Sequence, residues 1–259
     1  MKQILSSLKL VSATAGLMLL PTLASASSNL ESDDFVGISF WLISMALVAS
    51  TAFFFLETQR VEGKWKTSLS VAGLVTGIAF WHYLYMRGVW VDTGTSPTVY
   101  RYIDWLITVP LQIIEFYLIL RVCTNVSSGV FWRLLGASLV MLIFGFLGEV
   151  QLIDAGLGFA IGMAGWIYII YEVFAGEASK LSLASNNKGG QFAFNSLRLI
   201  LTAGWSIYPI GYFLGYLGGG ADLGTVNVIY NIADLVNKTA FGLAIWAGAT
   251  MDSQTEMDS

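Results

Sequence analysis

Seven runs of predominantly apolar residues, separated by short polar or glycine-rich breaks, constrain this chain more than any other sequence feature. A helix needs about 20 apolar residues to cross a hydrocarbon core roughly 30 Å thick, and each run is close to that length. We predict helices over Phe35–Leu56, Ser68–Met86, Thr98–Val122, Phe131–Leu147, Ala155–Phe174, Phe192–Leu217 and Thr225–Met251. The expected fold is an all-α membrane protein, a seven-transmembrane-helix bundle in one domain.

The composition excludes several other classes of protein. Only 12% of the residues are charged, half the share of about one quarter in a soluble domain, which excludes an ordinary cytosolic enzyme. A balance of 13 Lys and Arg against 17 Asp and Glu argues against a nucleic-acid partner. The single cysteine, Cys123, and the single histidine, His82, exclude an intramolecular disulfide and Cys- or His-rich metal centres. We therefore expect no metal site.

The N-terminus has the pattern of a cleavable secretory signal. Lys2 and Lys9 precede a largely apolar run over Leu10–Leu20, and the small residues Ala24, Ser25 and Ala26 follow it. A first transmembrane helix is the less favoured alternative, because the run is only about ten residues long and Pro21 follows it. We predict a signal peptide over residues 1–26 and a transmembrane domain over residues 27–259.

Basic residues predict the orientation of the bundle. Eight of them fall at loops or helix ends on one side, whereas Arg87 alone falls on the other. The eight are Arg60, Lys64, Lys66, Arg121, Arg133, Lys180, Lys188 and Arg198. Because positive charge accumulates on the cytoplasmic side, we expect the N-terminus outside and the C-terminus in the cytoplasm. The signal peptide supports the same orientation.

Five charged residues remain well inside the predicted spans, where an ionised group costs roughly 2.5–3.5 kcal/mol and is usually functional. They are Arg101, Asp104 and Glu115 in the third span, and Asp234 and Lys238 in the last. Their positions predict an order along the membrane normal, from Arg101 through the two aspartates and the lysine to Glu115. A structural salt-bridge network that holds the two spans together is the simpler alternative. One buried ion pair would fit that role well, and the presence of five charges makes it the less favoured interpretation.

This order places titratable groups on both sides of one amine. Two acidic neighbours on its outer side favour a charged Lys238, and a carboxyl among aliphatic side chains, Glu115, is expected to carry a proton. The arrangement could pass a proton outward from Glu115 through Lys238 to Asp104. An ion gradient or a cofactor has to drive it, because the chain has no Walker-type phosphate loop.

Aromatic residues favour the cofactor. They are Trp105 in the third span and Trp205, Tyr208 and Tyr212 on one face of the sixth. Such rings can hold a flat apolar ligand beside Lys238, and lysine forms Schiff bases with carbonyl compounds. For any single ring, core packing is the preferred interpretation.

These motifs resemble those of microbial (type 1) rhodopsins over the whole mature chain. Residues 101–115, RYIDWLITVPLQIIE, are similar to the third helix of that family. Residues 234–238, DLVNK, resemble its retinal-binding segment, and residues 205–209, WSIYP, its sixth-helix motif. Glu115, His82 within FWHY and the stretch MRGVW at residues 86–90 make the chain similar to the proteorhodopsin group.

The resemblance implies a light-driven outward proton pump with all-trans retinal bound to Lys238 as a protonated Schiff base. It implies that Asp104 accepts the proton, Glu115 donates one from the cytoplasm, Asp234 is a second counterion, Arg101 is a release gate, and His82 tunes the pKa of Asp104. Thr108 completes the Asp/Thr/Glu pattern of outward pumps, and Trp105, Trp205, Tyr208 and Tyr212 match pocket positions. Gln112 matches the position at which glutamine accompanies blue absorption.

The resemblance also implies a bacterial inner membrane protein, not an enzyme, that forms a ring-shaped pentamer or hexamer. A photosensory rhodopsin that signals to a membrane transducer is the main alternative, and a retinal-free secondary transporter is another. Chloride pumping is disfavoured because Asp104 would repel an anion. Glu57, Glu172 and Glu177 are interpreted as solvated charges, as is Glu149, for which a position on a release route is the alternative.

Overall fold

The computed structural model describes residues 30–257, so the predicted signal peptide lies outside the described residues. Every regular element in the described part of the chain is a helix. Six of them are long: α3 (Phe35–Glu57), α4 (Lys66–Thr93), α5 (Thr98–Cys123), α6 (Ser128–Glu149), α7 (Ala155–Phe174) and α11 (Leu223–Met257). The shorter pieces are η1 (Gly63–Trp65), α8 (Glu177–Ala184), α9 (Lys188–Leu199), η2 (Ile200–Gly204), α10 (Ile207–Tyr212) and η3 (Phe213–Leu217).

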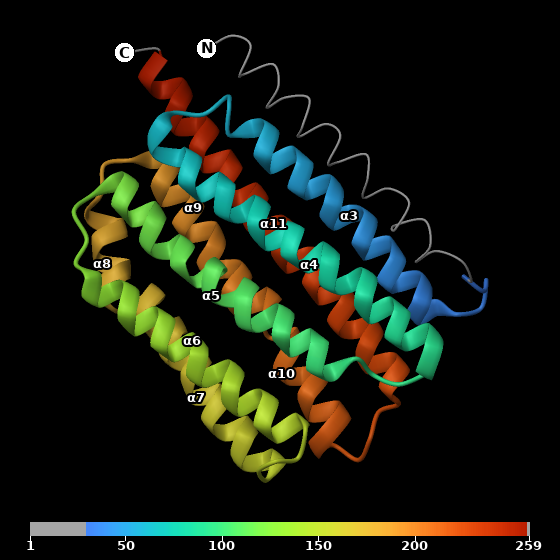
Figure 1. The fold of residues 1–259 in the computed structure, drawn as a ribbon. Coiled ribbons are helices and arrows are strands. Elements are labelled where there is room, and N and C mark those ends of the chain that lie inside the picture. The colour runs from blue at the N-terminus through green and yellow to red at the C-terminus, as the bar shows by residue number, and fades with distance from the viewer. Residues whose placement is uncertain (1–29, 258–259) are drawn as a thin grey trace, which may run out of the picture.

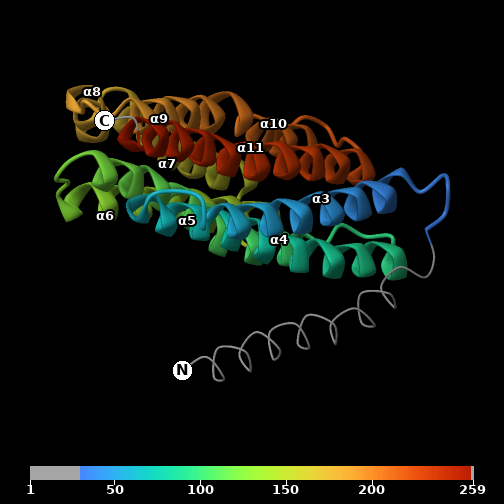
Figure 2. The ribbon, with the colours of Figure 1, turned by 90° about the horizontal axis from the view of Figure 1, so that it is seen from above.

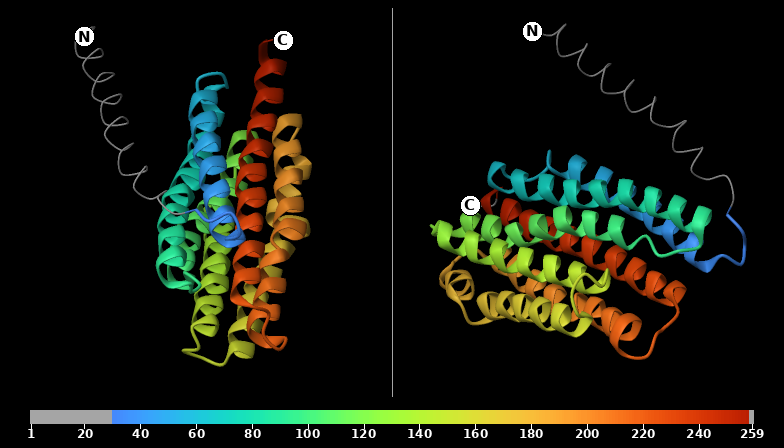
Figure 3. Two further views of the ribbon diagram at one scale, coloured as in Figure 1. Left: turned by 90° about the vertical axis from the view of Figure 1, so that its right-hand side faces the viewer. Right: turned by 60° about the horizontal axis from the view of Figure 1, so that its bottom comes forward.

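The long helices run side by side along one axis and form a single bundle (Figure 1). Seen from above, α9, α10 and α11 lie on one side and α3 to α6 on the other (Figure 2). We call the end of the bundle at which α11 ends the C-terminal end; α3 and α5 also end there, and α4, α6 and α9 begin there (Figure 3). With α9 to η3 counted as one crossing, the described residues form the predicted seven-helix bundle.

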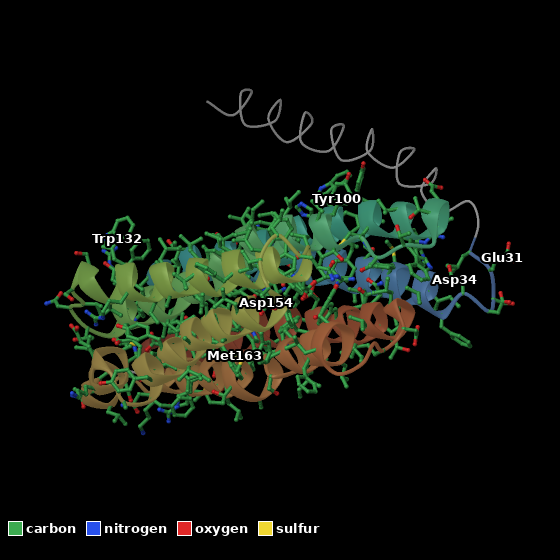
Figure 4. All side chains as sticks on the ribbon, turned by 90° about the horizontal axis from the view of Figure 1, so that it is seen from below. Glu31, Asp34, Tyr100, Trp132, Asp154 and Met163 are labelled. Atoms are coloured by element: carbon green, nitrogen blue, oxygen red, sulfur yellow. The ribbon has the colours of Figure 1, made fainter. Side chains whose placement is uncertain are left out.

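Local sequence explains how the first helix begins. Asp34 caps α3, because its Oδ1 accepts the backbone N–H of Gly37 at 2.8 Å. The same oxygen accepts Nε1 of Trp90 at 3.0 Å, which ties the start of α3 to α4. Figure 4 shows Asp34 at the end of the bundle opposite the C-terminal end. It also shows Trp132 projecting outward near the C-terminal end, and aromatic side chains in such positions are typical of a membrane interface.

The sixth crossing is not one continuous helix. The backbone N–H of Trp205 donates to the carbonyl of Ile200 at 3.1 Å, and that of Gly218 to the carbonyl of Phe213 at 2.6 Å, so both η2 and η3 are π turns. Pro209 lies between them, within α10. Such turns interrupt the regular ladder of hydrogen bonds and often occur at functional sites.

Hydropathy alone identifies five of the crossings. Within residues 30–257, five stretches are long and apolar enough to cross a bilayer. The two crossings that are not among them are the interrupted α9–η3 segment and α11, which carries Asp234 and Lys238 at mid-length. The sixth crossing is missed because it is broken into short pieces, whereas α5 is identified even though it carries Arg101, Asp104 and Glu115.

Several expectations about loops and charges are wrong. Helix α4 continues through the predicted loop to Thr93, so Arg87 is a buried helical residue, with its guanidinium 5.7 Å from the ring centre of Trp41. The predicted break before the sixth span contains α8. The carboxylates expected to be solvated are buried at three positions, Glu57, Glu149 and Glu172, whereas the side chain of Glu177 is 43% exposed and pairs with Arg133.

Partners on neighbouring helices explain the burial of two of these carboxylates. Glu57 accepts Nε1 of Trp246 at 2.9 Å and pairs with Arg60. Glu172 pairs with Arg133 at 2.9 Å. The contacts with Trp246 and Arg133 join residues far apart in the chain, and hydropathy does not reveal them.

Candidate functional site

Lys238 lies at the centre of a buried ion cluster. Its Nζ is 2.6 Å from Oδ2 of Asp104 on α5 and 3.0 Å from Oδ2 of Asp234, one turn earlier on α11. The lysine is 2% exposed and both aspartates are 0% exposed. The structure thus brings together the central amine and the two carboxylates predicted around it. The attraction between the opposite charges compensates for the hydration that these groups lose on burial.

Asp234 is the more fully hydrogen-bonded of the two carboxylates. Its oxygens accept the hydroxyls of Tyr83 and Tyr208, each at 2.7 Å, and Nε1 of Trp105 at 3.1 Å. The residue predicted as a second counterion is therefore held by four donors from three helices and its own. Such a carboxylate is stabilised in its ionised form.

Asp104 has fewer partners. Its Oδ1 has no hydrogen bond from the described residues, and Nδ1 of His82 lies 3.5 Å from it. The same nitrogen is 3.0 Å from the carbonyl of Ile78. Thr108 is buried one turn further along α5, but its hydroxyl donates to the backbone carbonyl of Asp104 and not to the carboxylate.

Arg101 lies beyond these carboxylates, toward the end of the bundle opposite the C-terminal end. Its guanidinium donates to Oδ1 of Asn227 at 2.9 Å and of Asn231 at 2.8 Å. It also donates to the Tyr83 hydroxyl at 3.2 Å, and that hydroxyl donates in turn to Asp234. Arg101 therefore reaches the ion cluster through a tyrosine.

Sequence reasoning missed Tyr83, Asn227 and Asn231. A signal was present for the two asparagines, because Asn227, Asn231, Asp234 and Lys238 follow one another at spacings of four, three and four, on one face of a helix. Tyr83 had no comparable signal beyond its position next to His82.

A cavity lined mainly by apolar and aromatic side chains adjoins the lysine. It lies between α5, α6, α7, the α9–η3 segment and α11. Its walls include all four predicted pocket aromatics, Trp105, Trp205, Tyr208 and Tyr212, together with Gln112 and Lys238. An apolar, aromatic cavity with one amine in its wall fits retinal, an elongated hydrocarbon that ends in a carbonyl carbon.

Gln112 is unusual among the residues that line the cavity. It is 2% exposed, and its Nε2 has no hydrogen-bond partner in the described part of the chain. An unsatisfied buried amide is costly, and the structure records no interhelical partner for this nitrogen. A polar donor without a partner therefore lies in the wall of a largely apolar pocket.

Glu115 lies apart from the cluster, on its C-terminal side. It is 1% exposed, and neither carboxyl oxygen has a hydrogen-bond partner among the described residues; the Ser68 hydroxyl lies nearby without bonding geometry. The adjoining Phe116 packs edge-on against Phe194 of α9 and Phe241 of α11. The structure thus isolates Glu115 in an apolar layer, as expected for a carboxyl that carries a proton.

Glu149 is a further buried carboxyl that sequence reasoning interpreted as solvated. It is 7% exposed, and its Oε1 accepts the hydroxyls of Tyr102 at 3.0 Å and of Tyr230 at 3.2 Å. It also lines the cavity. The tyrosines come from α5 and α11, so the position of Glu149 at the end of its own helix does not reveal them.

Known proteins agree with this arrangement. The sequence profile described as bacteriorhodopsin-like protein matches residues 34–251, and the chain belongs to this family. It is 53% identical to a green-light absorbing proteorhodopsin of Gamma-proteobacterium EBAC31A08, over 95% of this chain and 99% of that one. It is 52% identical to a blue-light absorbing proteorhodopsin of Gamma-proteobacterium Hot 75m4, over 95% and 98%.

A solved structure shows the same fold. The blue light-absorbing proteorhodopsin from Med12 superimposes with a TM-score of 0.75 and 58% identity, and the match covers 84% of this chain and 99% of that one. The predicted resemblance to proteorhodopsins is confirmed.

Proposed function

We propose that this chain is a light-driven outward proton pump that carries all-trans retinal on Lys238. One observation carries the proposal: a buried amine in the wall of an aromatic cavity is paired with two carboxylates on one side and has an isolated carboxyl on the other. Retinal, when bound through a Schiff base, supplies the absorption of light and the change of shape that follows isomerisation.

The chain's own residues then move the proton. Oδ2 of Asp104, 2.6 Å from Nζ, is placed to accept the proton of the lysine nitrogen. Asp234 stays charged, because its donors already satisfy it, and acts as the second counterion. Glu115 returns a proton from the C-terminal side, and Arg101 with Tyr83 lies on the release side.

His82 is proposed to tune the pKa of Asp104. Its Nδ1 is 3.5 Å from the carboxylate oxygen that lacks a hydrogen bond, so a small ring movement would complete that bond. Thr108 supports the same stretch of α5 by bonding the Asp104 carbonyl. An acid titration of absorption should therefore have a different midpoint in His82→Ala.

The proposed absorption is blue. Relatives of both colours are almost equally similar, at 53% for a green form and 52% for a blue one, so overall identity does not distinguish the colours. The proposal rests on Gln112, whose unsatisfied amide faces the cavity.

The setting of the pump follows from the charges and the resemblance. We place it in the bacterial inner membrane with the C-terminal end in the cytoplasm, the signal peptide of residues 1–26 removed, and the remaining chain assembled as a pentamer or hexamer. The transported species is a proton, and the activity is transport, not enzymatic catalysis.

The most direct test of the retinal site is Lys238→Ala in cells supplied with retinal. The variant should be colourless, because no other lysine lines the cavity. Lys66→Ala, at an exposed lysine, is the matched control and should keep the visible band. A normal band in Lys238→Ala would refute the assignment.

A further inference from the structure

Glu115 is 1% exposed, and neither of its carboxyl oxygens has a hydrogen-bond partner among the described residues. The C-terminal end of α5 lies eight residues away, about 12 Å at 1.5 Å per residue. The space between is filled by buried apolar side chains of four helices: Leu69, Phe116, Ile119, Leu120, Phe194, Leu197, Phe241, Ile245 and Ala249. If Glu115 returns a proton to Lys238, as proposed above, this apolar layer has to open for Glu115 to regain one.

A polar tie crosses the C-terminal surface of that layer. Oδ1 of Asp252 on α11 accepts Nδ2 of Asn187 at 2.7 Å, and its Oδ2 accepts Nε1 of Trp65 at 2.7 Å and pairs with Lys64 at 2.9 Å. Burial alone would raise the pKa of Asp252, but the hydrogen bonds from Trp65, Lys64 and Asn187 lower it below its ordinary value. Asp252 thus presents a charged acceptor to Asn187, the residue that caps the start of α9.

Helices α9 and α11 approach each other closely beneath these hydrogen bonds of Asp252. A Cβ at Gly189 would lie 2.3 Å from the carbonyl oxygen of Gly248, and a Cβ at Gly248 would lie 2.6 Å from the carbonyl oxygen of Gly189. Backbone packs closely on backbone at these two glycines. Among the described residues, the bond from Asn187 to Asp252 is the side-chain hydrogen bond that joins the start of α9 to α11 at this level.

The other end of α9 is connected to the ion cluster. Asn237, the neighbour of Lys238, donates from Nδ2 to the carbonyl of Gly204 in the π turn η2 at 3.0 Å. Its Oδ1 occupies the space of a Cβ at Gly204, since the two would be only 1.9 Å apart. Helices bend at π turns, so a displacement at Lys238 has a direct route to α9.

We propose that the hydrogen bond between Asn187 and Asp252 is a latch that holds α9 against α11 and closes the proton path to Glu115. The pair opens once in each turnover, when the contact of Asn237 with η2 is disturbed. Asn187 and Asp252 are positioning residues, because they act on proton entry and touch neither the lysine nor Glu115.

Asn187→Asp tests the latch with little risk to folding. Asn187 caps α9 through Oδ1, which accepts the N–H of Gly190 at 2.6 Å, and aspartate caps equally well. The variant replaces the donor to Asp252 with a like charge. Proton uptake from the medium after a light flash, followed with a pH dye on the retinal-loaded protein, should become about tenfold faster, equal to about 1.4 kcal/mol. The absorption maximum and the rate of proton transfer to Asp104 should not change.

Two further variants separate the latch from other roles of Asp252. Lys64→Gln removes the ion pair but keeps the bond to Asn187, so uptake should keep its wild-type rate. Asp252→Asn weakens the bond to Asn187 and should also accelerate uptake. Slower uptake in Asp252→Asn would make Asp252 a proton-collecting group and overturn the latch, as would an unchanged rate in Asn187→Asp. Failure of the proposed function is distinguishable, because illuminated cells that carry the wild-type protein would then not acidify their medium.

Discussion

Lys238 lies between two carboxylates that differ in their surroundings. Asp234 has two tyrosine hydroxyls and a tryptophan N–H in addition to the lysine, whereas Asp104 has one oxygen without a hydrogen bond. A carboxylate with many donors is favoured as the anion. The proton of the lysine is therefore expected to move to Asp104, and this asymmetry gives transfer its direction.

Glu115→Gln tests the donor at the same scale. The amide cannot release a proton, so the pigment should keep its colour while return of a proton to the Lys238 nitrogen slows by about 100-fold, within the range for loss of a general acid. Flash spectroscopy measures this step, and added azide, a diffusible proton carrier, should partly restore the rate. A photocycle of wild-type speed would favour the photosensory alternative.

Gln112→Leu tests the origin of the colour. Excitation moves positive charge away from the Schiff-base nitrogen, so a nearby amide dipole affects the ground and excited states unequally. Leucine fills a similar volume without the dipole, and the absorption maximum should move to longer wavelength while pumping continues. A wild-type maximum already in the green, or one that Gln112→Leu leaves in place, would contradict the blue assignment.

The charges of the site could be predicted from the sequence, but much of its hydrogen bonding could not. Asp104, Asp234 and Lys238 were identifiable because an ionised residue inside an apolar run is conspicuous. Tyr83 and Glu149 were not, because their roles depend on partners from other helices. Hydropathy reports the segment in which a residue lies, and not what faces it across the bundle.

At the scale of elements, the helix ends and interruptions were the hardest to predict. All seven crossings were predicted, but α4 continues seven residues beyond its predicted end at Met86. The π turns η2 and η3 have no hydropathy signature, since they change the hydrogen-bond ladder without changing the side chains' character. Both kinds of error concern backbone geometry that packing decides.

Glycine permits the close approach of α6 and α7, and Gly165→Ala tests this. A Cβ at Gly165 would lie 2.8 Å from the carbonyl oxygen of Ala137 and 3.1 Å from the backbone N of Met141. Because backbone cannot yield as a side chain can, the helices must move apart, at a cost of about 1–3 kcal/mol. Thermal unfolding followed by circular dichroism should show a lower midpoint.

Gly136→Ala is the matched control, because a Cβ at that exposed position of α6 meets nothing within 4 Å. Alanine is the better helix former by about 1 kcal/mol, so this variant should unfold at the same temperature or higher. Equal losses in both variants would show that close packing of α6 on α7 is not the reason.

At the scale of the whole molecule, Lys238 has a polar network toward one end of the bundle and an apolar layer toward the other. Asp104, Asp234, Arg101 and the asparagines of α11 form a continuous polar network toward the end opposite the C-terminal end. Glu115 is isolated on the other side behind apolar side chains. A proton that leaves Lys238 therefore has hydrogen-bonding partners on one side only, and outward transport requires the C-terminal end to face the cytoplasm.

The direction of light-driven proton movement tests this account most directly. Cells that express the protein and are supplied with retinal are suspended in weakly buffered medium and illuminated while an electrode records the external pH. We expect acidification that a protonophore abolishes and that is absent in Asp104→Asn, although that variant remains coloured. Alkalinisation of the medium, or no pH change from a fully coloured wild-type protein, would contradict the account.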